Sequence, residues 1–269
     1  MKKVTVVCAA AILVMASVSG AAIRYKQSGP WQDISVDDGI GGTTSGWQGG
    51  AVPGEGVDAR INWGNNTVTL DYEAPTVGNL KIGVDEGGHL VINEGGIMSS
   101  SGWSGIGVTG AISASMIVNS GGTANIGGHL WMGAGGVGNF GLLEINDGGV
   151  VNVGQNIGLG TINANSPSGG TATINVNDGG LLNLHHWSDT LSIQDGSVLN
   201  IFGSGIVTVG GNRVTAAYGY ADIGKITGNG GSGIMATFDP DLNLTTIVVP
   251  EPATMLLLGL GGLLIRRRR

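Results

Sequence analysis

The chain has 269 residues, of which 53 are glycine and 12% are charged. Ordinary soluble domains contain about 7% glycine and about 25% charged residues. A Gly-X-Y period is absent, and Val, Ile and Leu recur throughout, so the composition excludes collagen and a charged disordered chain. Four histidines and a single cysteine also exclude a zinc ribbon and a disulfide framework.

The first 22 residues have the layout of a secretory signal peptide. Two lysines follow the initial methionine, an apolar run extends over residues 4–18, and small residues occupy 19–22. We therefore predict cleavage in the region of Gly20, Ala21 and Ala22. The single cysteine, Cys8, lies inside this segment. The mature chain is accordingly expected to contain no thiol and no disulfide.

The last residues contain a second targeting pattern with three parts. Pro250, Glu251 and Pro252 precede an apolar stretch at 253–265, and Arg266, Arg267, Arg268 and Arg269 follow it. A helix of this stretch would rise only about 20 Å, less than the roughly 30 Å of a hydrocarbon core. The arginines are expected to stay on the cytoplasmic side of the membrane, with residues 23–249 outside.

This tail resembles the PEP-CTERM sorting signal of Gram-negative bacteria. The matching residues are Pro250, Glu251, Pro252, Gly259, Gly261, Gly262 and the four closing arginines. The resemblance implies transient anchoring in the inner membrane, then processing near Pro-Glu-Pro by an exosortase, a membrane enzyme. It also implies a final place at the cell surface or outside the cell, in bacteria that make exopolysaccharide. A plain carboxyl-terminal membrane anchor is the alternative.

Between these two signals the sequence contains a repeat, in which three sets of equivalent positions (columns) hold the same kind of residue. Four alternating apolar and polar segments end in an Asn-x-Gly-Gly turn, and we take residues 191–197 as a fifth, variant copy. The turn asparagines are Asn93, Asn119, Asn146 and Asn177. A second polar column comprises Ser99, Asn125, Asn152, Asn183 and Asn200, and a glycine column comprises Gly107, Gly133 and Gly160.

A repeat of 26 or 27 residues with short alternating strands is typical of a β-solenoid. We predict an all-β, right-handed parallel β-helix in which apolar residues point inward and the asparagine columns form hydrogen-bond ladders. The pattern over 45–210 resembles autotransporter-type repeats, although too few residues follow it for a barrel translocator.

The predicted organisation has five parts. A signal peptide at 1–22 is followed by an amino-terminal cap with the first coil at 23–76. Solenoid repeats occupy 77–210. A carboxyl-terminal cap at 211–246 contains a short helix over 213–225, which covers the open end of the solenoid. The sorting segment with its hydrophobic helix spans 247–269.

The charge and the titratable residues offer few candidates for chemistry. Residues 23–249 hold 18 acidic and 6 basic residues, a net charge of −12, which argues against nucleic acid as a partner. Asp147, Asp178 and Asp195 occupy equivalent positions of the repeat, where we interpret them as turn formers and leave calcium binding open. The pair His185 and His186 has no further ligand at metal-site spacing. We predict no catalytic residue, cofactor or metal ligand.

These observations favour a non-enzymatic, exported surface or matrix protein whose partners are an exosortase-like enzyme and exopolysaccharide. The alternative is a carbohydrate-active β-helix protein, either a lyase or hydrolase or a polysaccharide-binding module. An enzyme would need clustered carboxylates on one face. A binding module would need Trp103, Trp131 and Trp187 to line one face.

Overall fold

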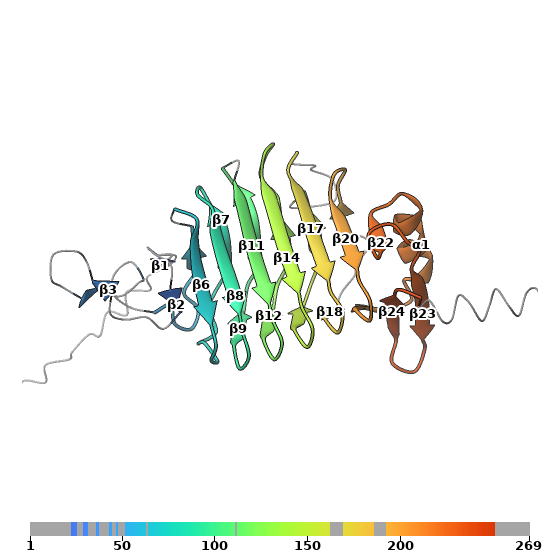
Figure 1. Cartoon of the computed structure of the whole chain (residues 1–269), viewed down its shortest axis with the longest axis horizontal. Coiled ribbons are helices and arrows are strands. Elements are labelled where there is room, and N and C mark those ends of the chain that lie inside the picture. The colour runs from blue at the N-terminus through green and yellow to red at the C-terminus, as the bar shows by residue number, and fades with distance from the viewer. Residues whose placement is uncertain are drawn as a thin grey trace, which may run out of the picture.

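The computed structural model describes residues 23–25, 29–31, 36–37, 43–44, 47, 52–62, 64–110, 112–161, 169–185 and 192–250. These residues form a β-solenoid of about six turns, as predicted. Successive coils follow one another along the long axis of the molecule, so that β6, β8, β11, β14, β17 and β20 lie side by side (Figure 1). The right-handed sense of the winding stays a prediction.

Three sheets run along the solenoid, and each of the five coils from β7 to β21 contributes one strand to each sheet. Sheet 1 contains β1 (Ile23–Tyr25), β5 (Ala59–Ile61), β7 (Leu80–Val84), β10 (Ser104–Thr109), β13 (Leu130–Met132), β16 (Ile157–Leu159) and β19 (Ser192–Ile193). Sheet 2 contains β2 (Gly29–Pro30), β6 (Asn66–Leu70), β8 (Gly88–Ile92), β11 (Ser113–Val118), β14 (Phe140–Ile145), β17 (Thr171–Val176), β20 (Val198–Ile201) and β22 (Ile226–Gly228). Sheet 3 contains β9 (Ile97–Ser100), β12 (Thr123–Ile126), β15 (Val150–Val153), β18 (Leu181–Leu184), β21 (Ile206–Gly210), β24 (Leu244–Val248) and β23 (Met235–Asp239). A separate antiparallel pair joins β3 (Val36–Asp37) to β4 (Thr43–Thr44).

Alternation along each strand produces the core. In β14, Leu143 and Ile145 are fully buried. Leu142, which precedes them, and Glu144, which lies between them, are half-buried on the outer side. Leu143 pairs in register with Met116 of β11 and with Ile174 of β17, so each inward residue stacks on the same position of the next coil. Each coil buries few side chains, but all coils share one continuous apolar cluster.

The predicted asparagine ladders are present. At the turn between sheets 2 and 3, Asn119 Nδ2 donates to Asn93 Oδ1 at 2.9 Å, and the bonds Asn146 to Asn119 and Asn177 to Asn146 are both 2.8 Å. The second column forms a ladder in sheet 3. Its members are Ser99, Asn125, Asn152, Asn183 and Thr208. These bonds satisfy both ends of the inner amide side chains without a ligand.

The last coil corrects the predicted register. Residues 191–197 do not form a fifth copy of the sheet 2 strand, because β19 pairs with β16 in sheet 1. The fifth copy is β20, whose Asn200 was wrongly predicted to follow Asn183, because Thr208 holds that position. Asn200 is instead the middle member of a third ladder, which runs from Asn175 to Thr227. The error arises because both corners need a glycine with positive φ: Gly196 has φ 80° and Gly203 has φ 54°. A turn signal alone therefore does not reveal which corner it belongs to.

The corner after sheet 1 requires the predicted glycine column. Gly133 has φ 58°, and a Cβ at this position would overlap the carbonyl oxygen of Thr171 in the next coil. Gly107 has φ 65° and a comparable approach to the Phe140 carbonyl. A side chain here would be strained in its backbone and would also collide with a neighbouring strand.

Both ends of the solenoid are closed. At the amino-terminal end, Trp31 and Trp47 are fully buried, their ring centroids are 4.7 Å apart, and Trp47 Nε1 donates to the Trp31 carbonyl at 2.8 Å. At the other end the predicted helix is α1 (Val214–Asp222), and its Ala217 is fully buried.

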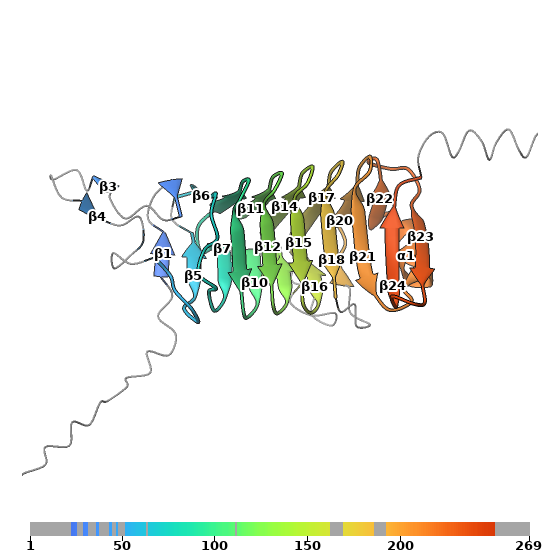
Figure 2. The ribbon, with the colours of Figure 1, turned by 90° about the horizontal axis from the view of Figure 1, so that it is seen from below.

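The β23–β24 hairpin closes sheet 3 next to this helix (Figure 2). β24 pairs antiparallel with β21 on one side and with β23 on the other. Tyr218 of α1 accepts a 3.2 Å hydrogen bond from the Ala236 amide, which occupies one donor of the outermost strand.

Candidate functional site

The tail motif begins directly at the end of a buried strand. β24 ends at Val248, Ile247 is fully buried, and Val249 is only 7% exposed, so residues 247–249, where the predicted sorting segment begins, are also part of the folded solenoid. Pro250 follows at once and is half-buried. No linker separates the motif from the fold.

Most of the predicted site residues lie outside the described residues. These are Glu251, Pro252, Arg266, Arg267, Arg268, Arg269, Gly20, Ala21 and Ala22. The predicted hydrophobic helix after residue 252 also lies outside them. Among the residues that the structure describes, no helix is long and apolar enough to cross a membrane.

The outer side of sheet 1 carries a cluster that we call the aromatic face, comprising Trp103, His129 and Trp131. Strand register explains it, because the residue before β10 (Trp103) stands level with the residue before β13 (His129). Trp131, two residues after His129, lies on the same side of the sheet. The two rings of His129 and Trp131 stack with centroids 4.8 Å apart and 20° between their planes.

Glycines make room for both indoles. A Cβ at Gly105 would lie 2.9 Å from Trp103 Cζ3, and one at Gly158 would lie 2.6 Å from Trp131 Cε3. Each indole therefore lies against bare backbone, and both tryptophans keep a partly exposed surface. Flat, partly exposed aromatic rings can stack on an apolar face of a ligand and leave its polar edges to water. Trp187, the third predicted member, lies outside the described residues.

A charged pair borders this face. Lys81 Nζ lies 2.6 Å from Asp58 Oδ2 and 4.9 Å from the centroid of the Trp103 ring. Burial raises the pKa of the Asp58 carboxyl, but hydrogen bonds from Lys81 and Asn79 outweigh that effect and hold its pKa below the usual value. The carboxylate therefore stays ionised and fixes the ammonium group over the Trp103 ring.

His129 completes the polar side of the face. Its Nδ1 accepts a 3.3 Å hydrogen bond from the Asn156 amide, so the neutral ring carries its proton on Nε2. Sequence reasoning missed both His129 and Lys81. The repeat spacing would have revealed them, because His129 is level with Asn79 and Trp103, and Lys81 is level with Gly105 and Trp131.

The other candidates do not converge on one place. Asp147 and Asp178 hold equivalent exposed turn positions, but Asp195 lies at the corner after sheet 1, where it pairs with Lys225 Nζ at 3.0 Å. The predicted stack of three aspartates is therefore wrong. Among the described residues, no group of three or more His, Cys, Asp and Glu side chains suits a metal ion. His185 is exposed, and His186 lies outside the described residues.

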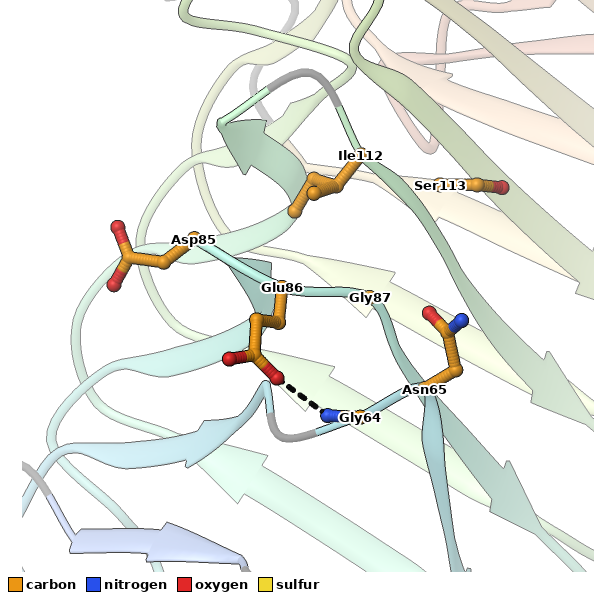
Figure 3. Close-up of a pocket in the computed structure, with 7 residues that line it drawn as sticks. All are labelled: Gly64, Asn65, Asp85, Glu86, Gly87, Ile112 and Ser113. Atoms are coloured by element: carbon orange, nitrogen blue, oxygen red, sulfur yellow. Dashed lines mark hydrogen bonds between the residues drawn. The ribbon is translucent and has the colours of Figure 1, made fainter.

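A shallow cleft of about 450 Å³ lies at the corner between sheets 1 and 2 (Figure 3). Its carboxylates, Asp85 and Glu86, are adjacent in one turn, and Figure 3 shows their side chains pointing in different directions. Glu86 Oε2 accepts the Gly64 amide at 2.6 Å, which ties this carboxylate to the turn of the preceding coil. This geometry differs from that of glycosidases, in which two carboxylates flank the scissile bond.

Comparison with known proteins identifies the tail. Residues 248–269 match the family model described as the PEP-CTERM protein-sorting motif. No curated protein and no solved structure gives a significant match to the chain. The chain is therefore an exported protein with a β-solenoid fold that carries a PEP-CTERM signal for sorting by an exosortase.

Proposed function

We propose that the folded solenoid is a non-enzymatic surface or matrix protein of a Gram-negative bacterium and that it attaches to exopolysaccharide through its aromatic face. The sorting signal implies export and transient membrane anchoring through the carboxyl terminus, ending at the cell surface. The resemblance of the tail to PEP-CTERM signals implies a host that makes exopolysaccharide, which is the reason for choosing this ligand. The observation that carries the proposal is the pair of partly exposed indoles on glycine backbone.

The aromatic face supports a neutral or weakly charged sugar chain as the ligand. Stacked His129 and Trp131 offer a flat apolar area, and the Nε2 proton of His129 and the Lys81 ammonium group offer donors at its border. Hydroxyl groups of a sugar ring accept such donors, while the ring C–H groups contact the aromatic plane. Lys81 is already neutralised by Asp58, which argues against strict selection for a polyanion.

The alternative is a lyase or hydrolase, which the geometry favours less. The two carboxylates of the cleft in Figure 3 come from adjacent residues of one turn and diverge. Catalysis by a carboxylate pair needs the two groups on opposite sides of one bond. Binding needs only the aromatic face and its bordering donors.

Substitution of Trp131 tests the binding. Trp131→Ala should weaken binding to exopolysaccharide from the native host about two- to twelvefold, because aromatic stacking is worth about 0.5–1.5 kcal/mol. Affinity electrophoresis of the purified protein measures this change. Leu142→Ala is the matched control, since Leu142 lies on the outer side of β14 in the same coil. Equal binding by the wild type and Trp131→Ala would refute the proposed face.

Substitution of Glu251 tests the sorting route separately. Glu251→Ala should leave export intact and block processing, because it spares the apolar stretch and the arginines. The intact mass of the protein in each cell fraction measures the outcome. Release of the same shortened product from this variant would contradict processing at the motif.

A further inference from the structure

An apolar stripe crosses the outer side of sheet 3 at its carboxyl-terminal end. We define the cap stripe as Leu181, Ile206, Val248 and Met235. Leu181 pairs with Ile206, Met235 pairs with Val248, and Ile206 stands one step from the Val207–Ile247 pair, level with Val248. All four side chains point outward, because their strand neighbours Leu182, Val207, Ile247 and Ala236 are the buried ones.

Exposed apolar side chains concentrate at this end of the molecule. Ile206 is 37% exposed and Met235 is 41% exposed. Among the described residues the large exposed apolar side chains are Val137, Ile206, Tyr218, Ile223, Met235 and Leu242. All but Val137 belong to the last coil and the cap, whereas the preceding coils show polar ladders and partly covered side chains. Ile206 and Met235 lie in the cap stripe with Leu181 and Val248, and a contiguous apolar stripe points to a contact surface.

The net charge differs between the coils and the cap. Residues 52–210 hold 12 acidic and 2 basic residues, a net charge of −10. Residues 211–249 hold 3 acidic and 2 basic residues, a net charge of −1. An anionic surface therefore repels the coils, which hold Leu181 and Ile206, more strongly than the cap, which holds Val248 and Met235.

The tail leaves the fold at the stripe itself. Val248 is a member of the stripe, and the apolar stretch at 253–265 begins only four residues after Val249. Four residues of extended chain span at most about 14 Å. β24 is held by β21 on one side and by β23 on the other, so the origin of the tail cannot swing away from the cap. Figures 1 and 2 place this hairpin at the very end of the solenoid.

We propose that the cap stripe rests on the lipid bilayer while the tail is inserted, so that the outer side of sheet 3 at this end faces the membrane and the corner between sheets 1 and 2 faces away from it. This inference rests on the proposed anchoring through residues 253–265 and adds an orientation to it. Apolar stripe residues contact the interfacial region of the outer leaflet, and the near-neutral cap incurs little repulsion there. Processing at the motif then separates the solenoid from its anchor, and the stripe leaves the membrane with the solenoid.

Site-directed fluorescence tests this orientation with the full chain. Cys8→Ser removes the single cysteine of the sequence, and an environment-sensitive fluorophore is then attached to Met235→Cys, Val137→Cys or Leu257→Cys. Each protein is reconstituted into vesicles of phosphatidylethanolamine and phosphatidylglycerol that contain lipid spin-labelled near the headgroup. Val137 is the matched control, because it is 82% exposed and lies in a loop of the acidic coils. The label at 257 reports whether the tail is inserted.

The expected result is at least twofold stronger lipid quenching at 235 than at 137, together with quenching at 257. Quenching at 257 with equal, weak quenching at 235 and 137 would overturn the orientation and leave the anchoring standing. Protection of the label at 235 from aqueous iodide without lipid quenching would assign the stripe to a second copy or to the tail, and so would also overturn it. Absence of quenching at 257 would refute the anchoring and the orientation with it.

Discussion

Substitution of the corner glycines gives the sharpest test of the solenoid geometry. Ala at position 133 would have to adopt φ 58°, which costs an L-residue about 1–2 kcal/mol. Its Cβ would also lie 2.5 Å from the carbonyl carbon of Thr171, and overpacking of this kind costs about 1–3 kcal/mol. Gly→Ala also reduces the conformational entropy of the unfolded chain, which stabilises the folded state by about 0.4–1 kcal/mol and offsets part of these costs. We therefore expect Gly133→Ala to lower the free energy of unfolding by about 2–4 kcal/mol.

Two control glycines separate the backbone strain from the collision. Gly56 has φ 74° with no atom near a Cβ, so Gly56→Ala should cost about 1 kcal/mol or less. Gly219 lies inside α1 with open space around it, and Gly219→Ala should stabilise by up to about 1 kcal/mol. Urea denaturation, followed by circular dichroism and by tryptophan fluorescence, measures all three midpoints. Equal stability of the 133 and 56 variants would refute the close contact between coils.

Two further predictions concern the ladders and the cap. Asn146→Ala removes two side-chain hydrogen bonds of 2.8 Å and should lower the free energy of unfolding by about 2 kcal/mol in the same assay; an unchanged midpoint would mean that the ladder adds nothing. A chain ended after Val249 should stay monomeric by light scattering. A chain ended after Asn243 lacks β24, so it loses the burial of Ile247 and Val249, which together stabilise the fold by about 4 kcal/mol. The same truncation exposes the edge of β21. The shorter chain should therefore aggregate, and a monomeric product would show that the hairpin is dispensable.

The middle coils follow from the sequence because their signals are local and periodic. Alternation sets which side chains of β8, β11, β14 and β17 point inward, and the repeated Asn-x-Gly-Gly sets where each strand ends. Three columns in one register then leave a single way to stack the coils. The ladders through Asn119 and Asn146 were predictable for the same reason.

The last coil was harder to predict, because the repeat becomes irregular there. Phe202 stands where the earlier copies have the turn asparagine, so the fifth copy was assigned one strand too early, to residues 191–197. Backbone hydrogen bonds from the preceding coil decide the true register: the Phe202 amide donates to the Val176 carbonyl at 2.8 Å, as Asn177 does to Ile145. Partner choice between strands is a long-range property that a turn motif does not encode.

The sequence by itself determined the sorting signal, because that signal is a local motif. It also determined the parallel coils, the inward apolar rows and the glycine corners, since these depend on neighbouring residues and on a repeat. Only the tertiary structure decided that Ile247 and Val249 belong to the core, that Trp103 and Trp131 lie against Gly105 and Gly158, and that an antiparallel hairpin closes sheet 3. Those features join residues across coils or at the end of the repeat, where burial and edge protection select the partner and periodicity no longer does.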